Sequence, residues 1–333
     1  MDLVYREAMH YQKLPGGKLA CELCPHHCVL ELNESGICRS RKNIKGKLWA
    51  TNYGKSIGIA VDPIEKKPLY HFHPCSMIAS LGPNSCNLKC DYCQNYQSSQ
   101  FEVVTHEIEP ALLYEEICKL YKNPKQVAFT YTEPFTWYEF IYDFAEAYSD
   151  VQIVMVSNGF INEIPLKEIL PKISAMNIDL KGFSDDFYTD FCQGKIEPVK
   201  NTIKTVFDAG VHLEVTLLLI PGRNDSDEDV RSLAQFIASI SKDIPLHISA
   251  YRPAYLTNIP ATKTEDVVRA IDIAKESLNW VYGGNLPGMT HAKTICVECD
   301  TLLIDRSVWY TENYLTESGT CPNCGFEVYG IFD

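Results

Sequence analysis

The chain has 333 residues and a formal net charge of −13, from 43 acidic and 30 basic side chains. Its 46% hydrophobic and 22% charged residues are typical of a folded globular protein and exclude a disordered or fibrous one. A protein with this excess of negative charge is not held on nucleic acid by overall electrostatic attraction, so we expect no nucleic-acid partner.

Fourteen cysteines are the unusual feature of the composition. The first residues carry charges without an apolar signal segment, and no apolar run approaches the ~20 residues of a membrane span. We therefore expect a cytoplasmic protein, in which clustered cysteines are usually metal ligands or catalysts. Three cysteines stand apart from the clusters and are expected to be inert buried thiols: Cys75, Cys118 and Cys192.

Residues 76–283 alternate short apolar runs with helical segments. Strands are expected at 77–82, 127–131, 151–156, 176–180, 212–220 and 246–251, and helices near 110–122, 136–148, 163–170, 197–209, 227–241 and 264–278. Repeated βα units predict an α/β fold whose parallel sheet curls into a partial (β/α)6 TIM-like barrel. Residues 1–75 and 284–333 lack this alternation, and we expect a cysteine-rich N-terminal extension and a C-terminal four-cysteine tail.

The loop after the first strand contains Cys86, Cys90 and Cys93 in the spacing CxxxCxxC, with no fourth cysteine nearby. A [4Fe–4S] cluster usually takes four thiolates, so three would leave one iron open to a ligand that is not protein. CxxC pairs also serve as zinc ligands or redox dithiols, but three cysteines at this spacing after an apolar strand match those poorly. We therefore predict that these cysteines are the ligands of a catalytic iron–sulfur cluster.

This loop and its flanking segments resemble the radical S-adenosylmethionine (SAM) superfamily. The similar segments are CELCPHHC (21–28), VDPIEKKPLYHF (61–72), CNLKCDYCQN (86–95), TYTEP (130–134), SNGF (157–160), DLKG (179–182), IPGRND (220–225) and CPNCG (321–325). Within the superfamily, the chain resembles radical SAM enzymes of the AmmeMemoRadiSam system, which are related to pyruvate formate-lyase activating enzymes.

The resemblance implies an activity. SAM would bind at the open iron, one electron would cleave it to methionine and a 5′-deoxyadenosyl radical, and the radical would abstract hydrogen from a substrate. The expected partners are an electron donor such as flavodoxin or ferredoxin and, for an activase, a protein substrate. Other branches act on RNA or on a small metabolite, and that alternative stays open.

The resemblance also implies SAM contacts near the ends of the first strands. Tyr92 stands where these enzymes place an aromatic residue beside the adenine. Glu133 lies in TYTEP, where the superfamily commonly has Gly-Gly-Glu-Pro, and would accept from the SAM ammonium. Ser157 and Asn158 would approach the ribose. The alternatives are a plain strand terminator at Glu133 and a simple turn at Asn158.

Further contacts are expected from the later strands and from the segment before the first one. Asp179 and Lys181 share a face and suit the SAM carboxylate or ribose, although a salt bridge at the strand end is the alternative. His247 is assigned as a cofactor contact, and a core histidine is the alternative. Asp62 matches a short Asp-containing segment at the substrate mouth of activases, although an ordered surface loop would look the same.

Two outer cysteine sets predict further metal sites. The C-terminal set forms two CxxC pairs and fits Zn²⁺ in a zinc ribbon, or iron as in rubredoxin, with ligands Cys296, Cys299, Cys321 and Cys324. The N-terminal set leaves zinc and an additional iron–sulfur cluster open, with a slight preference for zinc, and its ligands are Cys21, Cys24, Cys28 and Cys38. If all three sets held zinc, the chain would be a metal-stabilised binding module and not an enzyme.

Overall fold

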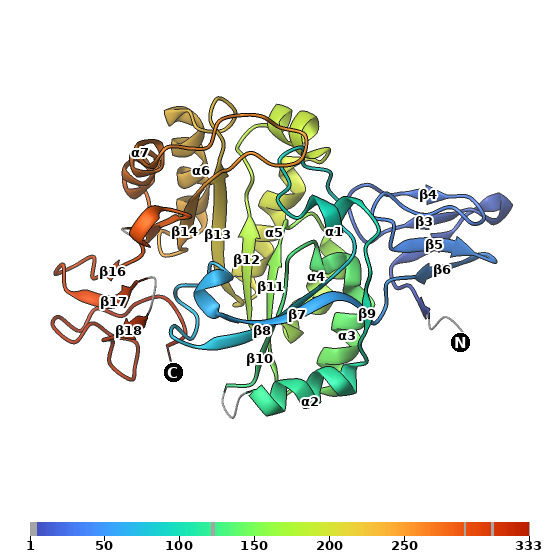
Figure 1. Ribbon diagram of the computed structural model, residues 1–333, viewed down its shortest axis with the longest axis horizontal. Coiled ribbons are helices and arrows are strands. Elements are labelled where there is room, and N and C mark those ends of the chain that lie inside the picture. Colours follow the sequence, from blue (N-terminus) through green and yellow to red (C-terminus); the bar gives the residue numbers. More distant parts are fainter. Residues whose placement is uncertain (1–4, 121–123, 290, 308–309, 333) are drawn as a thin grey trace.

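The computed structural model describes residues 5–120, 124–289, 291–307 and 310–332. Among these residues, one nine-stranded sheet forms the centre of the molecule, in the order β15-β14-β13-β12-β11-β10-β8-β7-β9 (Figure 1). Seven adjacent strands of this sheet run parallel to one another. They are β8 (Met77–Pro83), β10 (Gln126–Phe129), β11 (Gln152–Ser157), β12 (Ala175–Asp179), β13 (His212–Leu219), β14 (Leu246–Ala250) and β15 (Val281–Gly284). The predicted α/β fold with a partial barrel is confirmed.

Helices follow the parallel strands, as the alternation predicted. They are α2 (Pro110–Leu120), α3 (Tyr138–Ala147), α4 (Glu163–Ile169), α5 (Ile196–Asp208), α6 (Asp227–Ile240) and α7 (Thr264–Lys275). In α5, Ile196, Val199, Ile203 and Val206 recur every three or four residues and are buried, so one face of the helix packs on the sheet. No helix of the described residues is both long and apolar enough to cross a membrane.

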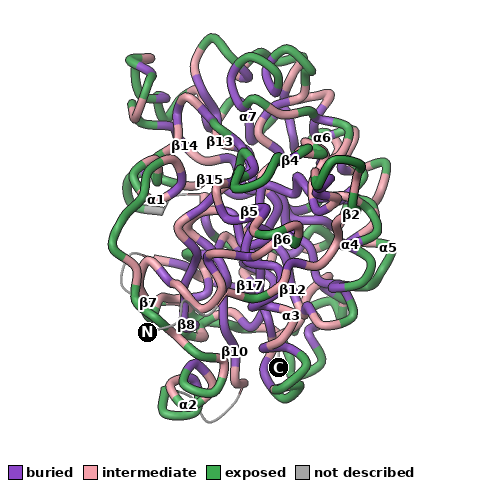
Figure 2. The backbone as a smooth tube through the Cα atoms, turned by 90° about the vertical axis from the view of Figure 1, so that its right-hand side faces the viewer, coloured by how far each residue is buried: buried purple, intermediate pink, exposed green. Residues whose placement is uncertain are grey.

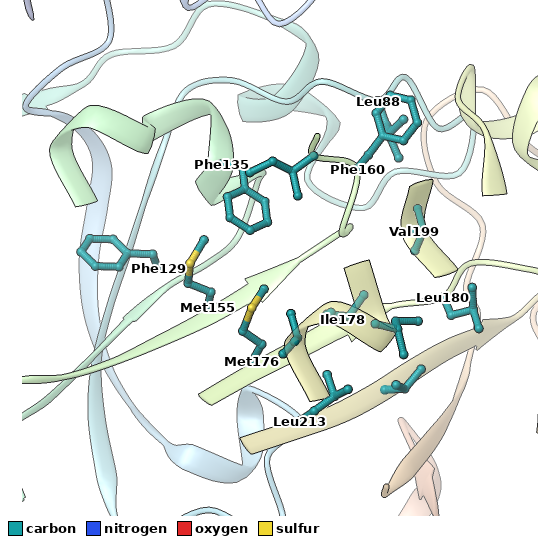
Figure 3. Packing of buried hydrophobic residues seen from close by; sticks show 14 of the residues in the cluster. Leu88, Phe129, Phe135, Met155, Phe160, Met176, Ile178, Leu180, Val199 and Leu213 are labelled. Atoms are coloured by element: carbon teal, nitrogen blue, oxygen red, sulfur yellow. The ribbon is translucent and has the colours of Figure 1, made fainter. Parts of the chain in front are cut away.

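A row of large side chains joins four neighbouring strands inside the core. Phe129, Met155, Met176 and Leu213 are register partners across β10, β11, β12 and β13, and each is fully buried. Figure 3 shows this row together with Ile178 of β12 and Leu180, which follows the end of that strand. In Figure 2 the buried stretches lie in the middle of the molecule and the exposed ones along the outer turns.

Three strands of the central sheet were not predicted. Strand β7 (Lys55–Pro63) lies within the expected N-terminal extension but pairs antiparallel with β8, and β9 (His106–Glu107) pairs with β7 at the sheet edge. Strand β7 is half exposed and contains Gly58 and Pro63, so its sequence does not show the continuous apolar run of a buried strand. For this reason the sequence did not predict it. Strand β15 has only four residues, two of them glycine.

The N-terminal extension contains two small antiparallel sheets, at the right of Figure 1. One contains β1 (Arg6–Glu7), β6 (Lys47–Ala50) and β5 (Arg41–Ile44), and the other β2 (Tyr11–Lys13), β3 (Leu19–Cys21) and β4 (Val29–Leu30). Arg41 on β5 forms a fully buried ion pair with Glu139 on α3. Breaking one partner of such a pair is costly, so this contact holds the extension against the barrel.

The C-terminal tail packs at the N-terminal ends of the barrel strands. Its strands are β16 (Thr294–Ile295), β17 (Leu302–Arg306) and β18 (Thr311–Asn313). The buried guanidinium of Arg306 donates to the carbonyl oxygens of Ala292 and Tyr70, and the Leu213 N–H donates to the Tyr329 hydroxyl. The tail thus covers the barrel end opposite to the one that carries chemistry in such folds.

Candidate active site

A cavity of about 370 Å³ lies where the parallel strands end. Among the predicted site residues, those that line it are Cys86, Cys90, Tyr92, Cys93, Asn158, Asp179 and Lys181. Thr216 and Leu218 of β13, Ser249 of β14 and Asn285 after β15 complete the wall from the far strands. Pockets of 300–1,000 Å³ with a few converging polar groups are typical of small-molecule sites.

The cysteine loop is held in place by backbone contacts. The N–H groups of Lys89 and Asp91 donate to the carbonyl oxygens of Cys192 and Phe191, at 3.0 Å each. Where β8 leads into the loop, a Cβ on Gly82 would lie 2.1 Å from the Thr130 carbonyl oxygen, so only glycine fits there. A close approach of two strand ends therefore sets where the loop starts.

The three thiols of this loop suit a cluster of several irons. All three thiols line one cavity, and its lining residues include no fourth cysteine. Three thiolates would hold three irons of a [4Fe–4S] cluster and leave the fourth without a protein ligand. The donor set therefore fits the predicted cofactor.

Lys181 brings positive charge to these thiols. Its ammonium lies 2.9 Å from Asp179 Oδ2, so the predicted pair at the end of β12 is formed. Burial lowers the pKa of Lys181, but Asp179 and the neighbouring thiol of Cys90 outweigh it and hold that pKa well above the usual value. Lys181 is therefore protonated and can hold an anionic group in the cavity.

Asn158 lies beside Cys86. Its Nδ2 is 3.7 Å from Cys86 Sγ and donates to Asn87 Oδ1 at 2.9 Å. Its backbone N–H donates to Glu133 at 2.8 Å, and so does the Ser157 hydroxyl at 2.8 Å. Asn158 is thereby fixed at the cavity wall by both its side chain and its backbone.

Glu133 and Ser157 lie behind this wall and are not among its lining residues. Burial raises the pKa of Glu133 to about 7, although the N–H and O–H groups that donate to its carboxylate act to lower it. Both oxygens of Glu133 already accept hydrogen bonds within the protein. The structure therefore supports a positioning role, and a direct contact to SAM stays a prediction.

Tyr92 lines the cavity and is buried, with 4% of its surface exposed. Its ring packs on Phe191 with centroids 5.3 Å apart, and its hydroxyl lies 3.3 Å from Cys192 Sγ. A hydrogen bond with Cys192, helped by Lys181, lowers the pKa of Cys90 against the effect of burial. Cys192 is a buried thiol, as predicted, but its position beside a cluster ligand was not expected.

Asp62 lies near the mouth of the cavity, on β7. It accepts from the ammonium of Lys67 at 2.9 Å and from the hydroxyl of Tyr131, a cavity residue, at 3.2 Å. Tyr131 has a φ of 70° and takes the place where the superfamily commonly has glycine. A backbone in this region is costly for an aromatic residue, which marks this turn as constrained. Tyr131 was not predicted as a site residue, although its position before Glu133 could have indicated it.

His247 lies away from the cavity, near the beginning of β14. Its Nε2 is 2.6 Å from Glu214 Oε2, and His212 contacts the other oxygen of that carboxylate at 3.0 Å. The backbone N–H groups of Tyr70 and His71 also donate to Glu214, whose pKa stays well below its usual value despite burial. The structure does not bring His247 together with the cysteine loop, and its position is that of a core histidine.

The outer cysteine sets differ in geometry. In the C-terminal set all four sulfur atoms lie within 4.8 Å of one another, so the predicted four-cysteine centre is formed. The N-terminal set lines a separate small cavity with Arg41, Asn87 and Thr136. The expectation of buried thiols was wrong for Cys75 and Cys118, which are exposed because their segments lie at the surface.

Comparisons with known proteins agree with this site. The family model described as the radical SAM superfamily matches residues 82–237, which include the cysteine loop and the ends of β8, β10, β11 and β12. The uncharacterized protein MJ0808 of Methanocaldococcus jannaschii is 39% identical over 97% of this chain and 98% of its own length.

Solved structures show more distant likenesses. A domain of pyruvate-formate lyase-activating enzyme from Bacteroides vulgatus is 20% identical, with a TM-score of 0.43, over 48% of this chain and 98% of that one. Streptococcus suis SuiB bound to S-adenosylmethionine is 15% identical, with a TM-score of 0.49, over 61% of this chain and 48% of that one. The family match, in which the cysteine loop lies at the cavity, identifies residues 82–237 as a domain of the radical SAM superfamily.

Proposed function

We propose that this radical SAM enzyme binds a [4Fe–4S] cluster on Cys86, Cys90 and Cys93 and uses it to abstract hydrogen from a substrate. The observation that carries the proposal is the single cavity in which these thiols meet Asn158, Asp179 and Lys181. When bound, the cluster would supply one electron for the reductive cleavage of SAM to the 5′-deoxyadenosyl radical.

The protein's own groups would orient SAM. Lys181 is the cation that suits the SAM carboxylate, while Asp179 and Asn158 can accept from or donate to the ribose hydroxyls. Tyr92, which lines the cavity, would offer an aromatic ring to the adenine. Burial of the cavity walls would keep water away from the reacting atoms.

The test is a variant with Cys86→Ala, Cys90→Ala and Cys93→Ala, assayed anaerobically with SAM and dithionite. It should form no 5′-deoxyadenosine, whereas Cys118→Ala, which removes an exposed thiol, should behave as the wild type. Unchanged SAM cleavage in the triple variant would contradict the proposal. A colourless wild type containing only zinc would instead support a metal-stabilised binding module.

A protein substrate, as for an activase, is the finer proposal. It is supported by an apolar surface beside the cavity mouth, where Tyr96 of α1 (Tyr96–Gln100) stacks on Tyr255 at 4.9 Å. Phe101 and Leu256 are 52% and 65% exposed next to this pair, and the Leu256 N–H is bonded to the cysteine loop at Asp91. Exposed apolar patches of this kind commonly mark protein contacts.

Isotope transfer separates a protein substrate from RNA or a metabolite. Candidate substrates would be deuterated, and the expected result is deuterium in 5′-deoxyadenosine only with a protein. The electron donor we propose is a flavodoxin or ferredoxin, because one electron per turnover is needed. We also propose a cytoplasmic location, since reduced cysteine ligands persist in reducing compartments.

A further inference from the structure

The four N-terminal cysteines form a second, separate metal site whose geometry differs from that of the C-terminal one. Cys21 ends β3, Cys24 and Cys28 follow in the turn to β4, and Cys38 precedes β5. All four line one small cavity, to which Asn87 and Thr136 of the barrel region also contribute. Four thiols converging on one buried space are a complete ligand set for a metal centre.

The spacing of the sulfur atoms distinguishes one ion from several. A single tetrahedral ion with metal–sulfur bonds of about 2.3 Å holds its sulfur atoms about 3.8 Å apart. The C-terminal set meets this, since Cys296 Sγ lies 3.6 Å from Cys324 Sγ and Cys299 Sγ lies 3.6 Å from Cys321 Sγ. That set therefore suits one metal ion.

The N-terminal set is wider. Among the described residues, the C-terminal four form a group of potential metal ligands that gathers within 4.8 Å, and neither the N-terminal four nor the three cysteines of the catalytic loop form such a group. Four thiolates that are shared among several irons must stand farther apart than four thiolates on one ion. The N-terminal geometry thus differs from that of the C-terminal centre, as that of the catalytic loop does.

The wall of the cavity offers hydrogen-bond donors to sulfur. The Ser40 hydroxyl donates to Cys38 Sγ at 3.2 Å, and Ser40 is buried. Arg41 also lines the cavity, with its side chain 1% exposed. Its terminal nitrogens bond Met9 and Glu139, but its buried Nε has no hydrogen-bond partner in the described structure. An orphaned cationic donor beside four thiols points to an anionic group in this space.

We propose that Cys21, Cys24, Cys28 and Cys38 hold a second iron–sulfur cluster, and that Arg41 and Ser40 stabilise its negative charge. The cluster lies beside the catalytic loop. His26 Nε2 is 2.7 Å from the carbonyl oxygen of Asn87, the residue after Cys86, and Asn87 lines the N-terminal cavity.

Metal analysis of the anaerobically reconstituted wild type is the first test. One [4Fe–4S] cluster accounts for about four irons, so the proposal predicts clearly more than four irons, matching inorganic sulfide, and about one zinc per chain. About four irons with about two zinc ions would overturn it. This measurement needs no variant and does not depend on activity.

The second test separates this proposal from that of the catalytic cluster. The Cys86→Ala, Cys90→Ala, Cys93→Ala variant should keep iron, sulfide and visible absorption at roughly half the wild-type level, and adding Cys24→Ser and Cys28→Ser should remove the rest. Complete loss of iron in the first variant, with native circular dichroism, would overturn the second cluster. Undiminished iron in it would instead count against the catalytic assignment.

A spectroscopic test on the intact protein covers the case in which these variants do not fold. Iron-57 Mössbauer spectra of the wild type should contain two cluster components, and addition of SAM should change only one, because four protein thiolates leave no open iron in the other. A single component that changes entirely with SAM would contradict the proposal. Cys118→Ser, which alters an exposed thiol, is the control for all preparations.

Discussion

The ammonium of Lys181 lies 2.9 Å from the carboxylate of Asp179, at the edge of the cavity that the three catalytic cysteines share. The pair stands at the end of β12, where both side chains face the barrel mouth. Within the pair, Lys181 is the less exposed partner, with 15% of its side chain accessible against 37% for Asp179. The cation is thus held in place while its partner stays available to a ligand.

Lys181→Met should weaken SAM binding. Loss of a charge-assisted hydrogen bond costs about 1.5–3 kcal/mol, so we expect the Kd for SAM to rise about 10- to 100-fold. Equilibrium dialysis of the anaerobic protein measures this. Lys167→Met is the matched control, because Lys167 pairs with Glu163 on an exposed helix face. An unchanged Kd in Lys181→Met would show that the carboxylate is bound elsewhere.

Gly82→Ala should distort the start of the cysteine loop. The added Cβ would meet the Thr130 carbonyl oxygen at 2.1 Å, so the two strand ends must separate. We expect the free energy of unfolding to fall by about 2 kcal/mol or more, with loss of catalytic iron. Denaturant unfolding and iron analysis check this. Cys118→Ala, which alters an exposed thiol outside the cysteine clusters, is the control and should change stability and iron content far less.

Cys299→Ser should remove one metal ion and loosen the tail. The C-terminal centre holds a segment whose buried residues Cys296 and Leu303 pack with Tyr70 and Trp280 at the base of the barrel. We expect a loss of about 3 kcal/mol or more in stability and one metal equivalent fewer. Thermal unfolding with elemental analysis measures both. If Cys299→Ser were as stable as Cys118→Ser, the metal would have no structural role.

Acid should weaken the contact between barrel and tail through His71. Burial lowers the pKa of His71 to about 3, and its ring nitrogens contact the Tyr329 carbonyl and the Tyr282 hydroxyl at 2.6 Å each. The unfolded chain binds a proton near pH 6.5 and the folded one only near pH 3, so the stabilisation is complete above pH 6.5 and is lost as the pH falls between these values.

The variant His71→Phe isolates this effect. Between pH 6.5 and pH 4, the wild type should lose up to about 3 kcal/mol more stability than the variant, at about 1.4 kcal/mol for each pH unit. Denaturant unfolding at several pH values measures the difference, and His106→Phe, at an exposed position on β9, is the control. Parallel pH profiles of His71→Phe and the wild type would contradict a neutral buried His71.

Local pattern in the sequence was sufficient for much of the fold and for the cluster loop. Apolar residues recur with a period of two in a strand and 3.6 in a helix, because one face of each element is buried. This pattern predicted six strands and the helices between them, and the structure contains them. The spacing of Cys86, Cys90 and Cys93 defines a ligand set because all three lie in one short loop. The two CxxC pairs of the tail likewise predicted a four-cysteine centre, because each pair brings two thiols together within one turn.

Position along a strand could have corrected one assignment. His247 shares a face with inward residues, but it is the second residue of β14 and so lies near the end remote from the cavity. The alternation of side chains along a strand shows which face of the sheet a residue lies on, but not which end of the barrel it is near. Asp179, the last residue of β12, reaches the cavity for the same reason that His247 does not.

Only the tertiary structure decided how distant segments meet. The burial of Glu133 under Asn158, the place of Cys192 beside Cys90 and the addition of β7 to the sheet edge all join residues far apart in the chain. The sequence determined which side chains could bind a cluster, because ligand chemistry belongs to the residues themselves. It did not determine the separation of the sulfur atoms, because that depends on how strands and turns pack around them.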